Sequence, residues 1–235
     1  MKYYFSKKEY FSIIFMLLIL FLGFVYTYKN SSIKVSSIPT MLPVSGKTII
    51  VDAGHGGWDP GKTGTNGDNE KDINLEISKI LSKYLETVGA NVVITRNEDI
   101  ALGDFKREDM KERKNIANSS DADILVSIHQ NSFPNKKTKG AQVFYYKNSE
   151  DSKKLAECIQ EKLITEVDND NNRLAKSNTE YYMLKSIDVP SVIVECGFLS
   201  NIKEEKLLNQ KYYQEKIAWA IYMGIIEYFS NRIEV

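Results

Sequence analysis

Two histidines and two glutamates stand where they could hold and use a catalytic metal ion. His55 follows the apolar run IIVDAG and His129 ends DILVSIH, so in a parallel sheet both would emerge at the carboxyl edge, where α/β proteins form ligand sites. Glu70 closes a glycine-rich stretch. Glu195 ends the apolar run PSVIVE, where a carboxylate is costly unless it faces a site or a partner. Two histidines and one glutamate form the three-ligand set of a catalytic zinc, with the fourth position left to water.

Each of these signals is weak alone. A single histidine at a strand end is more often a hydrogen-bonded structural residue, and a single loop glutamate is usually solvated. These are the only two histidines in the chain, and each follows an apolar run. Four such residues converging on one sheet edge therefore favour a metal site.

The same glycine-rich stretch also matches a phosphate-binding loop. Gly56, Gly61, Lys62 and Thr63 fit the pattern G-x-x-x-x-G-K-[ST]. Such a loop requires a helix directly after Gly-Lys-Thr, whose N-terminal amides hold the phosphates. Here residues 64–67 read GTNG and disfavour a helix, so nucleotide binding is the weaker interpretation.

The first thirty residues differ in kind from the rest. Three lysines, Lys2, Lys7 and Lys8, flank the start of an uncharged segment from Phe11 to Tyr28 that is long enough to cross a bilayer core of about 30 Å. No small-x-small cleavage site follows, which favours a retained anchor over a removed signal peptide. The remainder of the protein is then expected outside the cytoplasm, where little ATP is available.

The organisation predicted from the chain is one α/β domain behind this segment. We expect a signal anchor or signal peptide over 1–28, a tether over 29–46 and a catalytic domain over 47–235. Basic and acidic residues are balanced at 31 each, which gives no support for nucleic-acid binding.

Within the domain, short apolar runs alternate with amphipathic segments. Strands are predicted at KTIIVDA, NVVIT, DILVSIH, AQVFYY and SVIVEC, and helices near 72–88, 107–118, 152–167 and 212–229. Several strands are too apolar to have a solvent face. This pattern predicts a mixed, mostly parallel sheet with helices on both faces.

The two cysteines, Cys158 and Cys196, are too few for a disulfide framework, and two separate buried thiols are the default, although one bridge stays open. Cys196 beside Glu195 invites a thiol-nucleophile hypothesis with His129 as base. Neighbouring residues on a strand point to opposite faces, so Cys196 should face away if Glu195 faces the site. We therefore expect Cys196→Ser to retain activity.

Four motifs, in order, carry a resemblance to a known family. VDAGHGG, NEKDINLEI, SIHQNS and VECGFLSN resemble the motifs of the zinc-dependent N-acetylmuramoyl-L-alanine amidases of the amidase-3 type, over essentially all of 47–229. The resemblance implies a zinc ion held by His55, Glu70 and His129, and a catalytic Glu195. It also implies cleavage of the amide between N-acetylmuramic acid and L-alanine in peptidoglycan.

Four further polar residues are candidates for supporting the ligands or binding the substrate. Asp52 and Asn131 are candidates for orienting the ligands, although Asp52 alternatively caps a turn. Arg96 and Arg113 either hold carboxylates of the stem peptide or pair with nearby acids such as Glu98 and Glu112.

The subtype is inferred from the short chain, its N-terminal apolar segment and the lack of wall-binding repeats. These resemble the germination-specific, spore-cortex amidases, whose action leads to muramic-δ-lactam. Reaching the substrate would then depend on the membrane segment or on an exported accessory protein. A non-catalytic peptidoglycan-binding protein on the same scaffold is the main alternative.

Overall fold

The computed structural model describes residues 7–30 and 42–233. The chain divides into two compact units, Met1–Thr40 and Met41–Val235. The first contains helix α1, Lys7–Asn30. Among the described residues, no helix is both long enough and apolar enough to cross a membrane. Most of the predicted tether, residues 31–41, lies outside the described residues, and Val44 near its end is buried in the core of the second unit.

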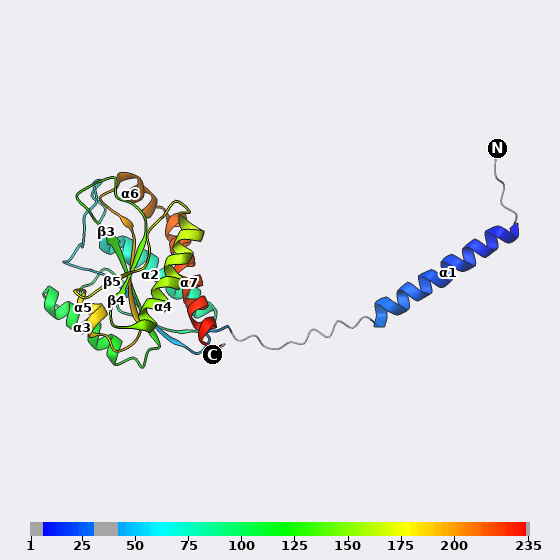
Figure 1. Cartoon of the computed structure of the whole chain (residues 1–235), viewed down its shortest axis with the longest axis horizontal. Coiled ribbons are helices and arrows are strands. Elements are labelled where there is room, and N and C mark those ends of the chain that lie inside the picture. The colour runs from blue at the N-terminus through cyan, green and yellow to red at the C-terminus, as the bar shows by residue number, and fades with distance from the viewer. Residues whose placement is uncertain (1–6, 31–41, 234–235) are drawn as a thin grey trace. The chain divides into compact units, whose positions relative to one another are not determined.

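The second unit is built on one six-stranded sheet (Figure 1). Its strands are β1 Thr48–Ala53, β2 Asn91–Ile94, β3 Ile124–Asn131, β4 Gln142–Tyr146, β5 Lys176–Asn178 and β6 Ser191–Phe198. They are ordered β2-β1-β3-β6-β4-β5, and only the β4–β6 pair is antiparallel. The predicted mixed, mostly parallel sheet is confirmed.

Helices cover both faces of this sheet. They are α2 Glu70–Thr87, α3 Lys106–Asn118, α4 Glu150–Lys162, α5 Tyr182–Ser186, α6 Ile202–Leu208 and α7 Lys211–Ile233, and a π-helical turn, Leu163–Val167, follows α4. Figure 1 shows α2, α4 and α7 on one side of the sheet and α3 and α5 on the other.

The five strands and four helices expected from the sequence are all present, with small differences at their ends. The first helix begins at Glu70 rather than near Asp72. The third is α-helical only as far as Lys162, and the π-helical turn completes the expected span. The short elements β5, α5 and α6 were not predicted, because three to seven residues are too few for a clear hydrophobic period.

Alternation along the central strands sets which face carries polar side chains. In β1, Ile49 and Val51 belong to the large core beneath α2, α4 and α7, whereas Ile50 packs in the smaller cluster on the opposite face. Toward the carboxyl ends of β1, β3 and β6, this same face carries four polar side chains: Asp52, Ser127, His129 and Glu195. The α3/α5 face therefore holds the candidate site.

Candidate metal centre

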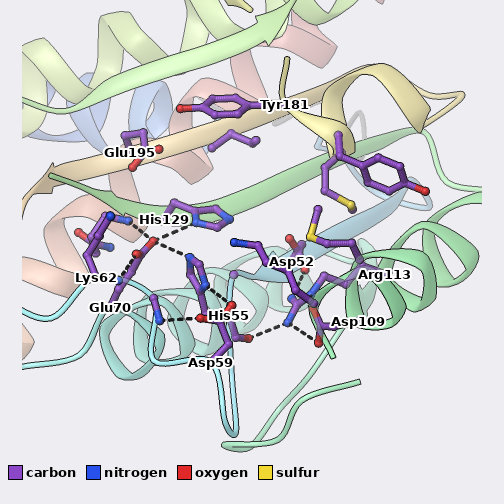
Figure 2. A pocket seen from close by; sticks show the side chains of 18 of the residues that line it. Asp52, His55, Asp59, Lys62, Glu70, Asp109, Arg113, His129, Tyr181 and Glu195 are labelled. Atoms are coloured by element: carbon purple, nitrogen blue, oxygen red, sulfur yellow. Dashed lines mark hydrogen bonds and ion pairs between the residues drawn. The ribbon is translucent and has the colours of Figure 1, made fainter. Parts of the chain in front are cut away.

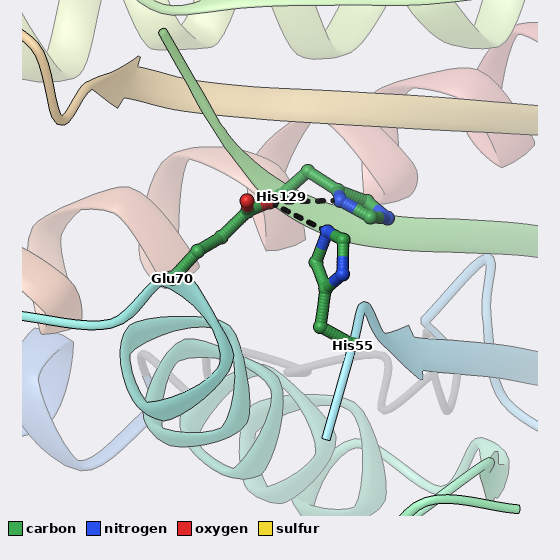
Figure 3. Close-up of side chains that lie close together, drawn as sticks. All are labelled: His55, Glu70 and His129. Atoms are coloured by element: carbon green, nitrogen blue, oxygen red, sulfur yellow. Dashed lines mark hydrogen bonds and ion pairs between the residues drawn. The ribbon is translucent and has the colours of Figure 1, made fainter. Parts of the chain in front are cut away.

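Three side chains from separate elements meet at the carboxyl edge of the sheet (Figure 3). His55 follows β1, Glu70 begins α2 and His129 lies in β3. The Glu70 Oε1 atom is 2.9 Å from His129 Nδ1 and 3.3 Å from His55 Nε2. One nitrogen or oxygen from each residue lies within 4.8 Å of the others, so the structure brings together all three predicted ligands.

His55 has a left-handed backbone conformation, and its side chain is bound to Asp59. Its backbone has a φ of 62°, a left-handed geometry that costs a non-glycine residue about 1 kcal/mol or more. Its Nδ1 is 2.7 Å from Asp59 Oδ2. An ionised carboxylate only accepts hydrogen bonds, so Nδ1 carries a proton, and Nε2 is the ring nitrogen that faces Glu70. Asp59 was not singled out from the sequence, although its H-x-x-x-D spacing within the loop was a visible signal.

Glu70 is fixed as an anion by backbone donors as well as by the imidazoles. The amide of Gln130 donates to its Oε1 at 3.0 Å, and the amide of Lys62 donates to its Oε2 at 2.8 Å. Burial by itself would raise the pKa of Glu70, but hydrogen bonds from His129 and His55 and their charges hold it below its ordinary value. The carboxylate therefore stays ionised.

Two glycines make room for this cluster. A Cβ on Gly54 would lie 2.3 Å from the His129 ring. A Cβ on Gly61, which has a φ of 67°, would lie 2.6 Å from Glu70 Oε2 and 2.8 Å from the His55 ring. The loop can approach the ligands this closely only because both positions lack a side chain.

Glu195 faces the same site from the neighbouring strand. It is the register partner of His129 across the β3–β6 pair and is 8% exposed. Its buried Oε2 has no hydrogen-bond partner among the described residues. Burial raises the pKa of Glu195 to about 7, and the nearby His129 offsets this only in part.

Glu195 and the three ligand candidates share one cavity of about 480 Å³ (Figure 2). Lys62, Asn131 and Tyr181 are also among the residues that line it. A cavity of this size admits a small segment of a polymer rather than a globular partner.

Cys196 does not face the site. It is 1% exposed and packs in the large core on the α2/α4/α7 face, as alternation predicted. Burial, together with the Glu195 charge, raises the pKa of its thiol far above the ordinary range, so the thiol stays neutral. Cys158 and Cys196 are both free, so the default of two separate thiols is confirmed, although Cys158 is half-buried rather than buried.

Asp52 and Arg113 form a buried ion pair beneath the site instead of touching ligand imidazoles or solvent. Arg113 donates to Asp52 Oδ1 at 2.7 Å, to Asp109 Oδ2 at 2.7 Å and to the carbonyls of Ala53 and His55. Arg113 is 2% exposed. It therefore supports the loop that carries His55, and its partners are Asp52 and Asp109 rather than Glu112.

The remaining contacts of Asp52 explain why it is ionised. Thr95 Oγ1 and Ser127 Oγ donate to it at 2.7 Å and 2.5 Å. Burial alone would raise its pKa, but Arg113 and these hydroxyls lower the pKa to about 2. Asp52 acts on the site through Arg113 and strand β3, not by a hydrogen bond to His55 or His129.

The side chains of Arg96 and Asn131 also form hydrogen bonds within the protein. Arg96 is 2% exposed and donates to the carbonyls of Ala53, Gly54, Lys71 and Glu98. It joins the loop after β1 to helix α2, and its guanidinium group is not offered to a ligand. The side-chain oxygen of Asn131 accepts from the amide of Ser132, and no hydrogen bond joins the Asn131 side chain to either imidazole in the described residues.

The donor set fits a divalent cation. His55 Nδ1 is protonated because it faces the Asp59 carboxylate, and His55 Nε2 faces the ionised Glu70 oxygen 3.3 Å away. Two acceptors repel at this distance unless a proton or a cation lies between them. Imidazole nitrogen and carboxylate oxygen are ligands that zinc accepts in proteins.

The glycine-rich loop does not have the geometry of a phosphate loop. Residues 64–69 form a turn closed by a bridge between Thr63 and Asn69, and helix α2 begins only at Glu70. The Lys62 amide, which would serve a phosphate, is already bound to the Glu70 carboxylate. The context that a nucleotide site needs is absent from this loop.

Known proteins share this chain's sequence and fold. Residues 49–227 match the family described as N-acetylmuramoyl-L-alanine amidase. A germination-specific N-acetylmuramoyl-L-alanine amidase of Bacillus subtilis (strain 168) is 37% identical over 235 residues, covering 97% of this chain and 97% of that protein.

Solved structures agree with this match. The CwlD amidase from Clostridioides difficile, in complex with the GerS lipoprotein, has 48% identity and a TM-score of 0.77, covering 79% of this chain and 100% of that one. An N-acetylmuramoyl-L-alanine amidase from Clostridium difficile 630 has 31% identity and a TM-score of 0.74, covering 80% of this chain and 99% of that one. Because the family match spans most of the chain and includes the strands and helix that carry the cluster, this chain belongs to the N-acetylmuramoyl-L-alanine amidase family.

Proposed function

We propose that this protein is a zinc-dependent amidase that cleaves the bond between N-acetylmuramic acid and L-alanine in peptidoglycan. The observation that carries the proposal is the pairing of a two-histidine, one-glutamate cluster with a buried, unpartnered carboxylate in one cavity. A metal site alone would suit a binding protein. Glu195 adds a group that can move a proton, which binding does not require.

His55, Glu70 and His129 are the residues that would hold the zinc ion. A bound zinc ion supplies Lewis acidity for the amide carbonyl and makes water acidic enough to lose a proton near neutral pH. Asp59 keeps His55 in the tautomer that offers Nε2, and the backbone amides of Lys62 and Gln130 keep Glu70 in place.

Glu195 is proposed as the general base and then the general acid. It would accept a proton from the attacking water and deliver it to the departing amine of L-alanine. A pKa near 7 suits a group that must do both at neutral pH. The absence of any hydrogen-bond partner on Oε2 within the described residues leaves that oxygen free for water.

We propose a role in the spore cortex as the biological setting. The B. subtilis relative is named germination-specific, and it aligns with nearly the full length of this chain. Removal of whole stem peptides would leave free lactyl groups on the glycan, which is the step expected before muramic-δ-lactam forms.

Export and a partner are parts of the same proposal. The uncharged segment Phe11–Tyr28 supports export to the outer side of the membrane. Fractionation of cells would show whether this segment is retained as a membrane anchor or removed by cleavage. CwlD was solved with a lipoprotein, GerS, which supports an exported accessory protein for this chain too. Affinity purification from sporulating cells that recovers no exported protein would contradict the partner.

The test is mass spectrometry of purified muropeptides incubated with the full-length chain, with and without zinc. We expect intact stem peptides with a free L-alanine amine, formed only with zinc. The Glu195→Ala variant should bind zinc and release nothing. Hydrolysis that persists after zinc is chelated would contradict the role of the metal, and zinc-loaded wild type that releases no stem peptide would contradict the proposed reaction.

A further inference from the structure

Tyr181 lies across the cavity from the three ligand candidates, His55, Glu70 and His129 (Figure 2). It directly precedes α5, in the connection from β5 to β6, and it lines the cavity together with Glu195 and the ligand candidates. Figure 2 shows the ring above the site, with its hydroxyl on the side of Glu195. The residue plays no part in the reaction as outlined so far.

The backbone and the ring of Tyr181 are both held in place. Its amide donates to Asn178 Oδ1 at 2.8 Å, next to the amide of Glu180, which donates to the same oxygen at 2.7 Å. The carbonyl of Tyr181 accepts from the amide of Lys185. The ring packs edge to face on Phe144, with centroids 5.6 Å apart. Such support is what a preorganised group needs.

The hydroxyl of this fixed ring is unused. Among the described residues, no protein group forms a hydrogen bond with it, although half-buried tyrosines usually find a partner. Burial raises the pKa of Tyr181, and the charges of Glu195 and Glu70 raise it further. The phenol therefore keeps its proton at neutral pH and is a hydrogen-bond donor rather than a base.

Two arginines and one backbone amide near the cavity are already committed as donors. The guanidinium groups of Arg96 and Arg113 are bound to carbonyls and carboxylates beneath the site. The Lys62 amide is bound to Glu70. Tyr181 adds a neutral donor that lines the same cavity as the three ligand candidates.

We propose that Tyr181 is a further catalytic residue, whose hydroxyl donates a hydrogen bond to the carbonyl oxygen of the scissile amide as negative charge develops on it. This inference rests on the proposed amidase function. No covalent bond to tyrosine forms, and the proton stays on the phenol throughout. The donor stabilises the tetrahedral state more than the substrate, so its effect belongs to kcat.

The test is Tyr181→Phe in the full-length, zinc-supplied chain, assayed by release of stem peptide from muropeptides. Loss of one such donor lowers kcat by about 10²-fold or more, with KM changed by less than about twofold. Zinc content per chain and the melting temperature should match the wild type, because the ring and its contact with Phe144 remain. Tyr146→Phe is the matched control, since Tyr146 packs in the same cluster around Phe144. It should keep wild-type kinetics.

Four results would overturn this role. Wild-type kcat in Tyr181→Phe would show that the hydroxyl does nothing, while leaving the proposed amidase function intact. A rise in KM with unchanged kcat would assign Tyr181 to substrate binding. A shifted pH optimum with full kcat at the new optimum would show that Tyr181 acts only through Glu195. Absence of release by both wild type and variant would refute the amidase function and, with it, the role of Tyr181.

Discussion

His129 and Glu195 lie side by side on neighbouring parallel strands, as register partners in the β3–β6 pair. The pairing places a candidate ligand and a candidate base on one face at the same height of the sheet. The same alternation turns Cys196 into the opposite core. A buried carboxylate in this position, near the ionised Glu70, is unfavourable for folding unless the site uses it.

Neutralising Glu195 is therefore expected to stabilise the metal-free protein. Its pKa rises from 4.5 to about 7 on folding, so folding disfavours the ionised form, and stability falls as the pH rises from 4.5 to 7. The penalty at pH 8 is at most about 3 kcal/mol, at about 1.4 kcal/mol for each pKa unit. Glu195→Gln should gain about 1–3 kcal/mol at pH 8 and less at pH 5. Urea denaturation in the presence of a chelator measures this gain in stability. An equal gain at pH 5 and pH 8 would be inconsistent with burial of the charge.

Removing the Asp59 carboxylate should weaken metal binding without unfolding the protein. Asp59→Asn replaces a charged group that can only accept with a neutral amide that can also donate to His55 Nδ1, so the lone pair is no longer confined to Nε2. Such supports are worth about 10- to 100-fold in metal affinity. Competition with a chromophoric zinc chelator measures the change. Asp104→Asn, on an exposed loop away from the ligands, should bind zinc as the wild type does.

A methyl group at Gly54 should displace His129. The Cβ would lie 2.3 Å from the ring, closer than any real contact, so the imidazole must move out of reach of Glu70. We expect Gly54→Ala to lose stoichiometric zinc and at least about 10²-fold in activity, since a 1 Å misplacement can cost that much. Gly197→Ala is the control because its Cβ would meet the tip of Leu208 at 3.2 Å and Glu204 Cδ at an ordinary contact distance of 3.6 Å. Equal zinc contents in the two variants would show that the ring tolerates the methyl.

Asp52 should contribute stability that disappears in acid. Its pKa falls from 3.8 to about 2 on folding, so the contribution is complete above pH 3.8 and is lost as the pH falls through 2. The shift corresponds to about 2 kcal/mol. Asp52→Asn should cost at least that at pH 7, and its difference from the wild type should narrow below pH 4. Chemical denaturation across this range tests the trend.

A surface carboxylate provides the comparison for Asp52. Asp151, whose side chain is 46% exposed, lies 3.7 Å from Arg232. Exposed ion pairs contribute about 0–1 kcal/mol, so Asp151→Asn should change little at any pH. An equal loss of stability in Asp151→Asn and Asp52→Asn would mean that burial does not set the strength of the ion pair between Asp52 and Arg113.

The strands, the ligand types and the family resemblance could all be predicted from the sequence, for local reasons. Apolar β-branched runs specify buried strands, and the residue that follows such a run emerges at a sheet edge. His55, His129 and Glu195 were found in this way. The alternation of strand side chains also predicted that Cys196 lies on the far face.

The partners of the arginines and the role of Asp52 were decided by tertiary structure. Arg113 donates a hydrogen bond to Asp52, which is 61 residues away in the sequence, and Arg96 donates to the carbonyl of Ala53, which is 43 residues away. Local sequence favoured nearer acids, because it holds no information on which distant groups share a buried layer. Tyr181 was missed for the same reason. A tyrosine before a five-residue helix has no recognisable pattern, and only the packing of α5 against β6 brings Tyr181 into the cavity of the ligand candidates. Sequence therefore determined which elements form, whereas long-range packing determined which polar groups they bring together.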